Sequence, residues 1–131
     1  MPLANVNGTK LRYEDTGAAD GARRDVLLLL HAFPLSSGMW SRQVASLGGR
    51  FRVLAPDFRG FGGSGPAPEV STMDLFAEDV RALLEHLRVE RAVVAGCSMG
   101  GYVAFALHRL APGLFRGLVL CDTKAAADGD E

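Results

Sequence analysis

The chain has 131 residues, which is enough for one domain with a hydrophobic core. Hydrophobic residues make up 48% of it and charged residues 22%, a composition that excludes an intrinsically disordered chain. The 14 basic and 15 acidic residues nearly cancel and the basic ones are dispersed, so the charge pattern indicates neither a nucleic-acid partner nor a membrane-surface partner.

The first predicted element is a β-hairpin. The pair Asn7-Gly8 is favoured in two-residue hairpin turns, and Leu11 and Tyr13 alternate with polar neighbours on its far side. The segment 17–22, which consists mostly of small residues, follows and predicts a loop.

Apolar runs and helical spacing then alternate along the chain. Unbroken apolar runs predict buried strands at 26–30, 51–55, 92–95 and 118–121. Apolar residues at helical spacing predict helices at 40–47, 72–87 and 99–110. The alternation predicts an α/β fold, with a doubly wound, mostly parallel sheet, flanking helices and the N-terminal β-hairpin. We expect the terminal segment 125–131 to be solvated and give it no function.

The cysteines and the N-terminus bear on the cellular compartment. Cys97 and Cys121 each lie in an apolar run that ends a predicted strand, which favours buried free thiols over a disulfide framework. The first residues lack a basic region followed by a long apolar stretch, and the run 26–30 is too short to cross a bilayer. We therefore expect a cytoplasmic protein without an export signal or a membrane anchor.

A candidate nucleophile follows the predicted strand 92–95. The run Gly96-Cys97-Ser98-Met99-Gly100 lies between this strand and a helix, the context of a nucleophile elbow that lifts a serine hydroxyl above a sheet. The glycines allow an abrupt turn, and the unpaired N–H groups of the helix N-terminus favour a developing oxyanion. The alternative is a chance match in which Ser98 only caps the helix that starts at Met99.

The segment His31-Ala32-Phe33-Pro34 comes directly after the predicted strand 26–30. A loop at this position supplies the second donor of an oxyanion hole in hydrolases with such an elbow. We predict that the backbone N–H of Phe33 and that of Met99 form the donor pair. His31 is expected to brace the loop through hydrogen bonds rather than to act as the catalytic base.

A glycine-rich turn, residues 57–64, follows the predicted strand 51–55. Its Asp57 and Arg59 are expected to bond to neighbouring backbone and side chains, which is a structural role. The spacing of its glycines fits neither nucleotide-binding fingerprint, and no Lys-Ser/Thr pair follows. We therefore predict no cofactor and no metal.

These three segments, in this order, resemble the α/β-hydrolase family, and the similarity extends over essentially the whole chain. Within it the Ser-Met-Gly-Gly elbow is similar to that of carboxylesterases, enol-lactone hydrolases and cofactor-free perhydrolases. The resemblance implies hydrolysis of small carboxylic esters or lactones through an acyl-enzyme on Ser98. Haloalkane dehalogenases and epoxide hydrolases carry aspartate at the elbow, so Ser98 argues against both.

The family's remaining catalytic residues have no clear counterpart. Family members run in chain order nucleophile, acid, histidine, with the histidine near the end of a chain about twice as long. His86 and His108 lie in predicted helices, where packing or solvent-facing roles dominate. Asp122 matches a position from which some relatives supply the acid, although it can equally cap the loop that starts at Thr123.

Residues 1–131 are accordingly expected to be the N-terminal part of a single α/β-hydrolase domain, truncated or split. Without a histidine to take its proton, Ser98 stays an ordinary alcohol and the chain alone is expected to be nearly inactive. We also expect an exposed sheet edge onto which a C-terminal segment or a second chain docks. The alternatives are a non-catalytic module that binds a small ligand or a protein partner, and carbon–carbon bond hydrolysis or perhydrolysis at the same elbow.

Overall fold

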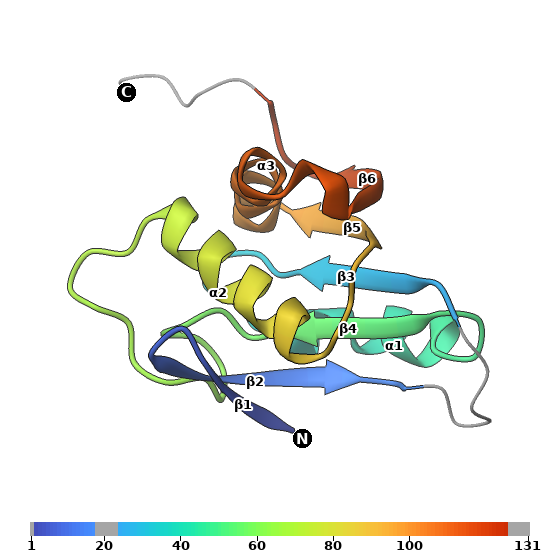
Figure 1. Cartoon of the computed structure of the whole chain (residues 1–131), viewed down its shortest axis with the longest axis horizontal. Helices are drawn as coiled ribbons and strands as arrows, with labels where there is room; N and C mark the ends of the chain where they lie inside the picture. Colours follow the sequence, from blue (N-terminus) through green and yellow to red (C-terminus); the bar gives the residue numbers. More distant parts are fainter. Residues whose placement is uncertain (1, 18–23, 126–131) are drawn as a thin grey trace.

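The structure, a computed structural model, describes residues 2–17 and 24–125. Within them a six-stranded sheet lies between helices on its two faces (Figure 1). Most of the predicted loop 17–22 and nearly all of the predicted solvated tail lie outside the described residues.

The sheet has the strand order β1-β2-β4-β3-β5-β6. The strands β1, β2 and β4 are antiparallel neighbours, whereas β4, β3, β5 and β6 run parallel to one another. This confirms the predicted mostly parallel sheet of an α/β fold. The strands are β1 (Leu3–Val6), β2 (Thr9–Asp15), β3 (Val26–Leu30), β4 (Arg52–Pro56), β5 (Ala92–Cys97) and β6 (Phe115–Cys121).

The predicted N-terminal hairpin is confirmed. Val6 pairs with Thr9 across a turn in which Asn7 has φ 49° and Gly8 has φ 74°. Two successive positive φ angles define the tight turn whose twist matches that of the flanking strands, and asparagine and glycine adopt them most readily.

The helices divide between the two faces of the sheet. One face carries α2 (Met73–His86) and α3 (Met99–Leu110), and the other carries α1 (Ser41–Leu47) (Figure 1). The helix predicted at 40–47 is divided, because a 3₁₀ turn, η1 (Ser37–Trp40), precedes α1. A second 3₁₀ turn, η2 (Pro112–Leu114), joins α3 to β6, and β6 begins three residues earlier than the predicted strand 118–121.

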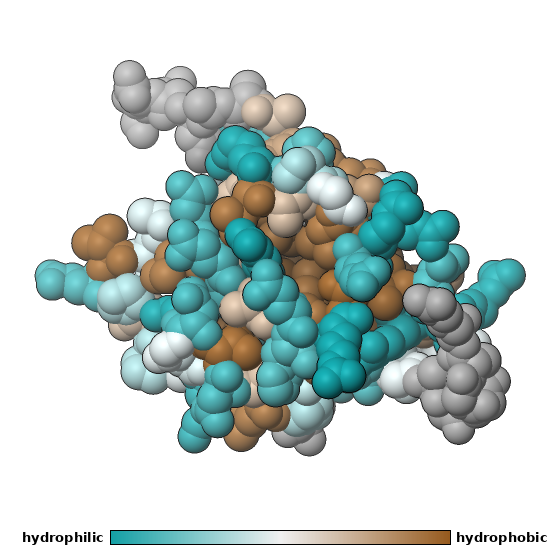
Figure 2. Space-filling model, viewed as in Figure 1, coloured by the Kyte–Doolittle hydropathy of each residue, from teal (hydrophilic) through white to brown (hydrophobic). Residues whose placement is uncertain are grey.

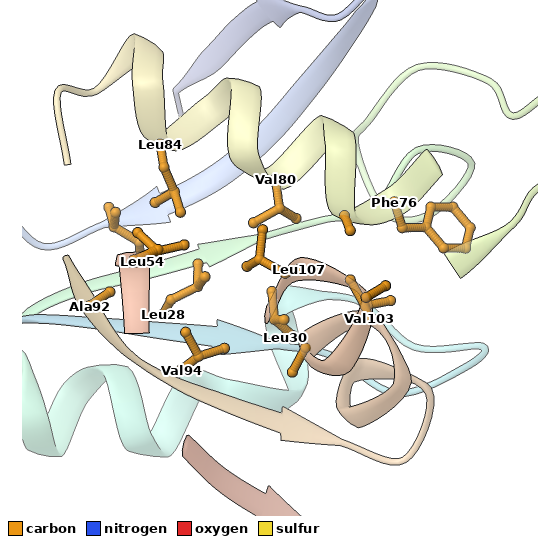
Figure 3. Close-up of a cluster of buried hydrophobic side chains, with 14 of the residues drawn as sticks. Leu28, Leu30, Leu54, Phe76, Val80, Leu84, Ala92, Val94, Val103 and Leu107 are labelled. Carbon is orange, nitrogen blue, oxygen red and sulfur yellow. The ribbon is translucent and has the colours of Figure 1, made fainter. Parts of the chain in front are cut away.

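The larger core cluster lies between the sheet and the helix pair α2 and α3 (Figure 3). Val80 of α2 and Leu107 of α3 are fully buried there, against Leu28 and Leu54 of the sheet. Complete burial of such a side chain contributes roughly 1.5–3 kcal/mol. This packing fixes the position of α3 relative to the sheet. The start of α3, Met99, is thereby held beside the carboxyl ends of β3 and β5.

The strand predicted at 118–121 is present as part of β6, but the prediction that it is buried is wrong. Leu118, Val119 and Leu120 are 40%, 46% and 42% exposed. The reason is position, because β6 is the last strand of the described sheet and has a strand neighbour, β5, on one side only. Hydrophobic residues also reach the surface among hydrophilic ones on the face drawn in Figure 2.

Candidate active site

Ser98 is the single residue between the end of β5 and the start of α3. Its backbone has φ 52° and ψ −113°, and its side chain is exposed. A residue with a side chain adopts such angles only at a cost of about 1–3 kcal/mol, which the surrounding structure must offset. The strand-to-helix turn at Ser98 is therefore sharp and strained, as a nucleophile elbow is.

Backbone and side-chain hydrogen bonds hold this strained turn in place. The Ser98 N–H donates to the carbonyl oxygen of Cys121 at 3.0 Å, which ties the turn to the end of β6. The Ser98 carbonyl oxygen accepts from the N–H of Gly101 at 2.9 Å and from the Thr123 hydroxyl at 2.9 Å. Both backbone polar groups of Ser98 are thus satisfied within the protein.

Close packing around the turn explains its glycines. A Cβ atom at Gly96 would lie 2.4 Å from the carbonyl oxygen of Gly100, and one at Gly100 would lie 2.1 Å from the carbonyl oxygen of Leu30. Both separations are far below van der Waals contact, and the clashing atoms belong to the backbone. The turn therefore packs directly on the end of β3, where the loop 31–34 begins.

This contact predicts the effect of a methyl group at Gly100. Gly100→Ala is expected to lower the free energy of unfolding by about 3 kcal/mol or more, because the backbone of β3 must move to make room. Gly113→Ala is the matched control, since a Cβ atom there meets nothing within 4 Å. It should change stability by less than about 1 kcal/mol. Urea denaturation of the two variants measures the difference, and equal losses would contradict the packing argument.

Phe33 and Met99, the predicted oxyanion donors, lie on the two segments that this contact joins. Phe33 is 66% exposed and is linked to Pro34 by a cis peptide bond, and Met99 is the first residue of α3. Within residues 2–17 and 24–125, neither backbone N–H donates to a protein acceptor. Both N–H groups are therefore available to an oxygen of a bound molecule, and their role as donors stays a prediction.

His31 is completely buried and both of its ring nitrogens are occupied. Nε2 accepts the N–H of Phe58 at 2.9 Å, which leaves Nδ1 to donate to the carbonyl oxygen of Ala32 at 2.9 Å. Burial lowers the pKa of His31, although the Ala32 bond and the nearby Asp57 charge oppose this. A neutral, fully bonded ring cannot take the proton of Ser98, and these bonds confirm the bracing role expected of His31.

Asp57 bonds to three segments from a fully buried position. Its carboxylate accepts the Ser37 N–H at 2.7 Å, the Gly63 N–H at 2.9 Å and Nη1 of Arg12 at 3.0 Å. Burial acts to raise the pKa of Asp57, but these hydrogen bonds outweigh it and hold the pKa below its usual value. Asp57 thereby fixes the loop after β3, the glycine-rich turn and β2 to one another, which confirms its predicted structural role.

Arg59 of the same turn also has a structural partner. Its guanidinium makes two bonds to the buried carboxylate of Asp79, at 2.7 and 2.8 Å, and a third to the carbonyl oxygen of Asn7. The Asn7 amide in turn donates to Asp79 at 2.8 Å. The turn is therefore attached to α2 and to the N-terminal hairpin, and its charged groups are engaged by the protein itself.

Within the described residues, no hydrogen bond joins the Ser98 side chain to the other titratable residues considered for catalysis. His86, the last residue of α2, and His108, near the end of α3, are both exposed, and the His108 ring packs edge-on against Phe115. Asp122 follows β6 directly with φ 47° and is exposed. It lies next in sequence to Cys121, whose carbonyl oxygen accepts the Ser98 N–H, so the end of β6 keeps it near the elbow.

The described residues contain no group of three or more histidine, cysteine, aspartate or glutamate side chains that could hold a metal ion. In the same part of the chain, every helix is too short or too polar to cross a lipid bilayer.

The fold is similar to that of two enzymes of known structure. A thermophilic esterase from Thermogutta terrifontis superposes with a TM-score of 0.86 at 41% identity, over 98% of this chain and 47% of that one. An enol-lactonase from Burkholderia xenovorans LB400 superposes with a TM-score of 0.87 at 35% identity, over 93% of this chain and 46% of that one.

Sequence comparison adds a relative with a different reaction. A soluble epoxide hydrolase from Corynebacterium sp. (strain C12) is 35% identical over 102 residues, which are 78% of this chain and 34% of that protein. The chain thus spans less than half the length of each of these three relatives. The sequence profile of the alpha/beta hydrolase fold matches residues 25–130. With the strained turn at Ser98, the sheet order and these matches, the chain belongs to the alpha/beta hydrolase family.

Proposed function

We propose that this chain carries the nucleophile and the oxyanion hole of a serine hydrolase that acts on small carboxylic esters or lactones. The observation that supports this most is the backbone of Ser98, which is held at φ 52° between β5 and α3 with its side chain exposed. A protein keeps such strain where a side chain has to be presented at a fixed point. A serine that merely capped α3 would not need it, and its side chain makes no capping hydrogen bond.

In the proposed reaction the Ser98 hydroxyl oxygen attacks the carbonyl carbon of the ester. The carbonyl oxygen becomes an oxyanion, which accepts hydrogen bonds from the N–H groups of Phe33 and Met99. Collapse of this intermediate expels the alcohol and leaves an acyl group on Ser98, and water then releases the acid. A lactone ring opens by the same steps.

The reaction needs a base and an acid in addition to Ser98. The base must take the hydroxyl proton and return it to the leaving alcohol, and the three histidines of the chain are placed elsewhere. We propose that residues 1–131 form the N-terminal part of one domain and that a C-terminal segment or a second chain supplies the histidine. Asp122 remains a candidate for the acid. The exposed apolar strand β6 is the proposed docking edge for the completing segment.

The relatives guide the choice of substrate class. An esterase and an enol-lactonase superpose on nearly the whole chain, whereas the soluble epoxide hydrolase aligns by sequence. Because the resemblance associates an elbow aspartate with epoxide hydrolysis, Ser98 favours an ester or lactone over an epoxide.

We place the protein in the cytoplasm on the ground that its two cysteines are free thiols.

A fluorophosphonate probe tests the nucleophile directly. The protein produced from the whole reading frame that contains these residues should be labelled on the peptide with Ser98 and should hydrolyse a short-chain ester such as p-nitrophenyl acetate. The 131-residue chain alone should label at least about 100-fold more slowly, because nothing activates its serine. Labelling at another serine, or no labelling of the whole protein, would contradict the proposal.

A non-catalytic module is the second candidate, because no histidine is hydrogen-bonded to Ser98 among the described residues. It is favoured if the natural gene ends near Glu131 and Ser98→Ala leaves the cellular role of the protein intact. Carbon–carbon bond hydrolysis and perhydrolysis share the elbow, and analysis of the products from candidate substrates separates them from ester hydrolysis.

A further inference from the structure

The two cysteines of the chain lie at paired positions on neighbouring parallel strands. Cys97 ends β5, Cys121 ends β6, and the two are paired in register. Paired residues of parallel neighbours project to the same face of a sheet. Adjacent strands lie about 4.8 Å apart, which falls within the Cα separation of roughly 4.4–6.8 Å that a disulfide spans. The backbone register therefore places the two Cα atoms at a separation that a disulfide can span.

Both thiols are partly exposed and neither is in a disulfide. Cys97 packs at the margin of the core cluster on the α1 face of the sheet, where it is only half-covered. Burial, the neighbouring Cys121 and the Asp122 carboxylate together raise the pKa of the Cys97 thiol. The influence of Cys121 on the pKa of Cys97 agrees with the register of the two strands.

This pair is directly connected to the elbow. Cys97 precedes Ser98 in the chain, and the carbonyl oxygen of Cys121 accepts the Ser98 N–H at 3.0 Å. A covalent bridge between the ends of β5 and β6 would act on the two backbone segments that hold the strained turn. Displacement of a reacting atom by about 1 Å can slow a reaction about 100-fold.

We propose that Cys97 and Cys121 form a dithiol site that a peroxide converts to a disulfide, and that this bridge slows the reaction of Ser98. One thiolate attacks a peroxide oxygen, which gives a sulfenic acid and, from hydrogen peroxide, one hydroxide that takes a proton to become water. The second thiol attacks the sulfenic sulfur and releases the other oxygen as water. Two thiols lose two electrons and two protons, and one peroxide is reduced. The part concerning Ser98 rests on the proposed function.

The bridge is tested in the whole protein by hydrogen peroxide treatment followed by alkylation and peptide mass spectrometry. We expect a linked pair of peptides containing Cys97 and Cys121, two hydrogens lighter than their sum, with dithiothreitol restoring both thiols. Cys97→Ser and Cys121→Ser should each prevent the link and leave a sulfenic acid that dimedone traps. Separately alkylated cysteines after oxidation, or only links between different molecules, would overturn the proposal.

A second measurement probes thiol proximity without oxidation. Phenylarsine oxide, a trivalent arsenical that two adjacent thiols bind together, should bind once per chain and should lose this binding in either serine variant. The rate of disulfide formation should also rise with pH above neutrality, because the thiolate is the reacting form and the pKa of Cys97 is raised. Binding that persists in both variants would contradict the dithiol site.

The effect on Ser98 is measured separately as the rate of fluorophosphonate labelling. Ser98 of the oxidised protein is expected to be labelled at about one tenth of the rate in the reduced protein, or more slowly. Reduction should restore the full rate. Cys121→Ser should label at the same rate with and without peroxide. If the linked peptides form but Ser98 never labels, the proposed function fails and the dithiol site stands. If Ser98 labels equally fast in both redox states, the bridge has no influence on the elbow.

Discussion

The Ser98→Gly variant of the whole protein is expected to lose ester hydrolysis by at least about 10⁴-fold and to become more stable than the wild type. The activity falls because the nucleophilic oxygen is gone. The stability rises because glycine adopts φ 52° and ψ −113° without the steric cost that serine bears there. After the larger entropy of an unfolded glycine is subtracted, the gain should be about 1 kcal/mol.

Ser98→Ala is the control that separates the two effects. It removes the same oxygen but keeps a Cβ atom in the strained backbone, so it should lose activity equally without the gain in stability. Thermal unfolding of both variants, together with p-nitrophenyl ester turnover, gives the comparison. Residual activity near the wild-type level in either variant would show that Ser98 is not the nucleophile. Equal stability of the two variants would show that the turn is not strained.

Replacement of Asp57 by alanine is expected to lower the free energy of unfolding by about 3–5 kcal/mol. The substitution leaves the N–H groups of Ser37 and Gly63 without an acceptor and Arg12 without its counter-ion. Asp57→Asn retains the shape and one acceptor oxygen, so its loss should be smaller. Guanidinium denaturation of the two variants tests this order. A loss below about 1 kcal/mol for alanine would mean that the three segments hold their positions without Asp57.

The same carboxylate gives stability a defined dependence on pH. The pKa of Asp57 is below its usual value of 3.8 in the folded state, so the folded protein holds the ionised form more strongly than the unfolded chain does. Its contribution is therefore complete above the usual pKa and is lost as the pH falls through the lower, folded pKa. Acid unfolding of the wild type should be steeper than that of Asp57→Asn, because the variant has no carboxylate to protonate there.

The features that the sequence predicts well are those with a local cause. Asn7-Gly8 determines the hairpin because those residues tolerate positive φ, and their neighbours pair as expected. The helix predicted at 99–110 has those bounds in the structure, since a glycine-containing turn precedes it and Pro112 follows it. The sharp turn at Ser98 is recognisable for the same reason, because a short pattern of glycines specifies an abrupt change from a strand to a helix.

The features that it does not predict depend on partners far apart in the chain. Arg12 meets Asp57 across 45 residues, and Asn7 meets Asp79 across 72. Neither pair has a spacing that marks it in advance, because strand order decides which segments become neighbours. The exposure of β6 has the same origin. An apolar run such as 118–121 indicates that burial of these side chains is favourable. It does not indicate which segment packs against them.

The strand order also governs how the chain reaches its native state. The strand β3 lies between β4 and β5 in the sheet. It comes early in the chain, whereas β5 follows only after α1, β4 and α2. Pairing of strands so far apart in the chain has an entropic cost, so the docking of β5 onto β3 is expected to be a late and slow step. During synthesis, β3 therefore leaves the ribosome well before its second partner, with one edge still open to other chains.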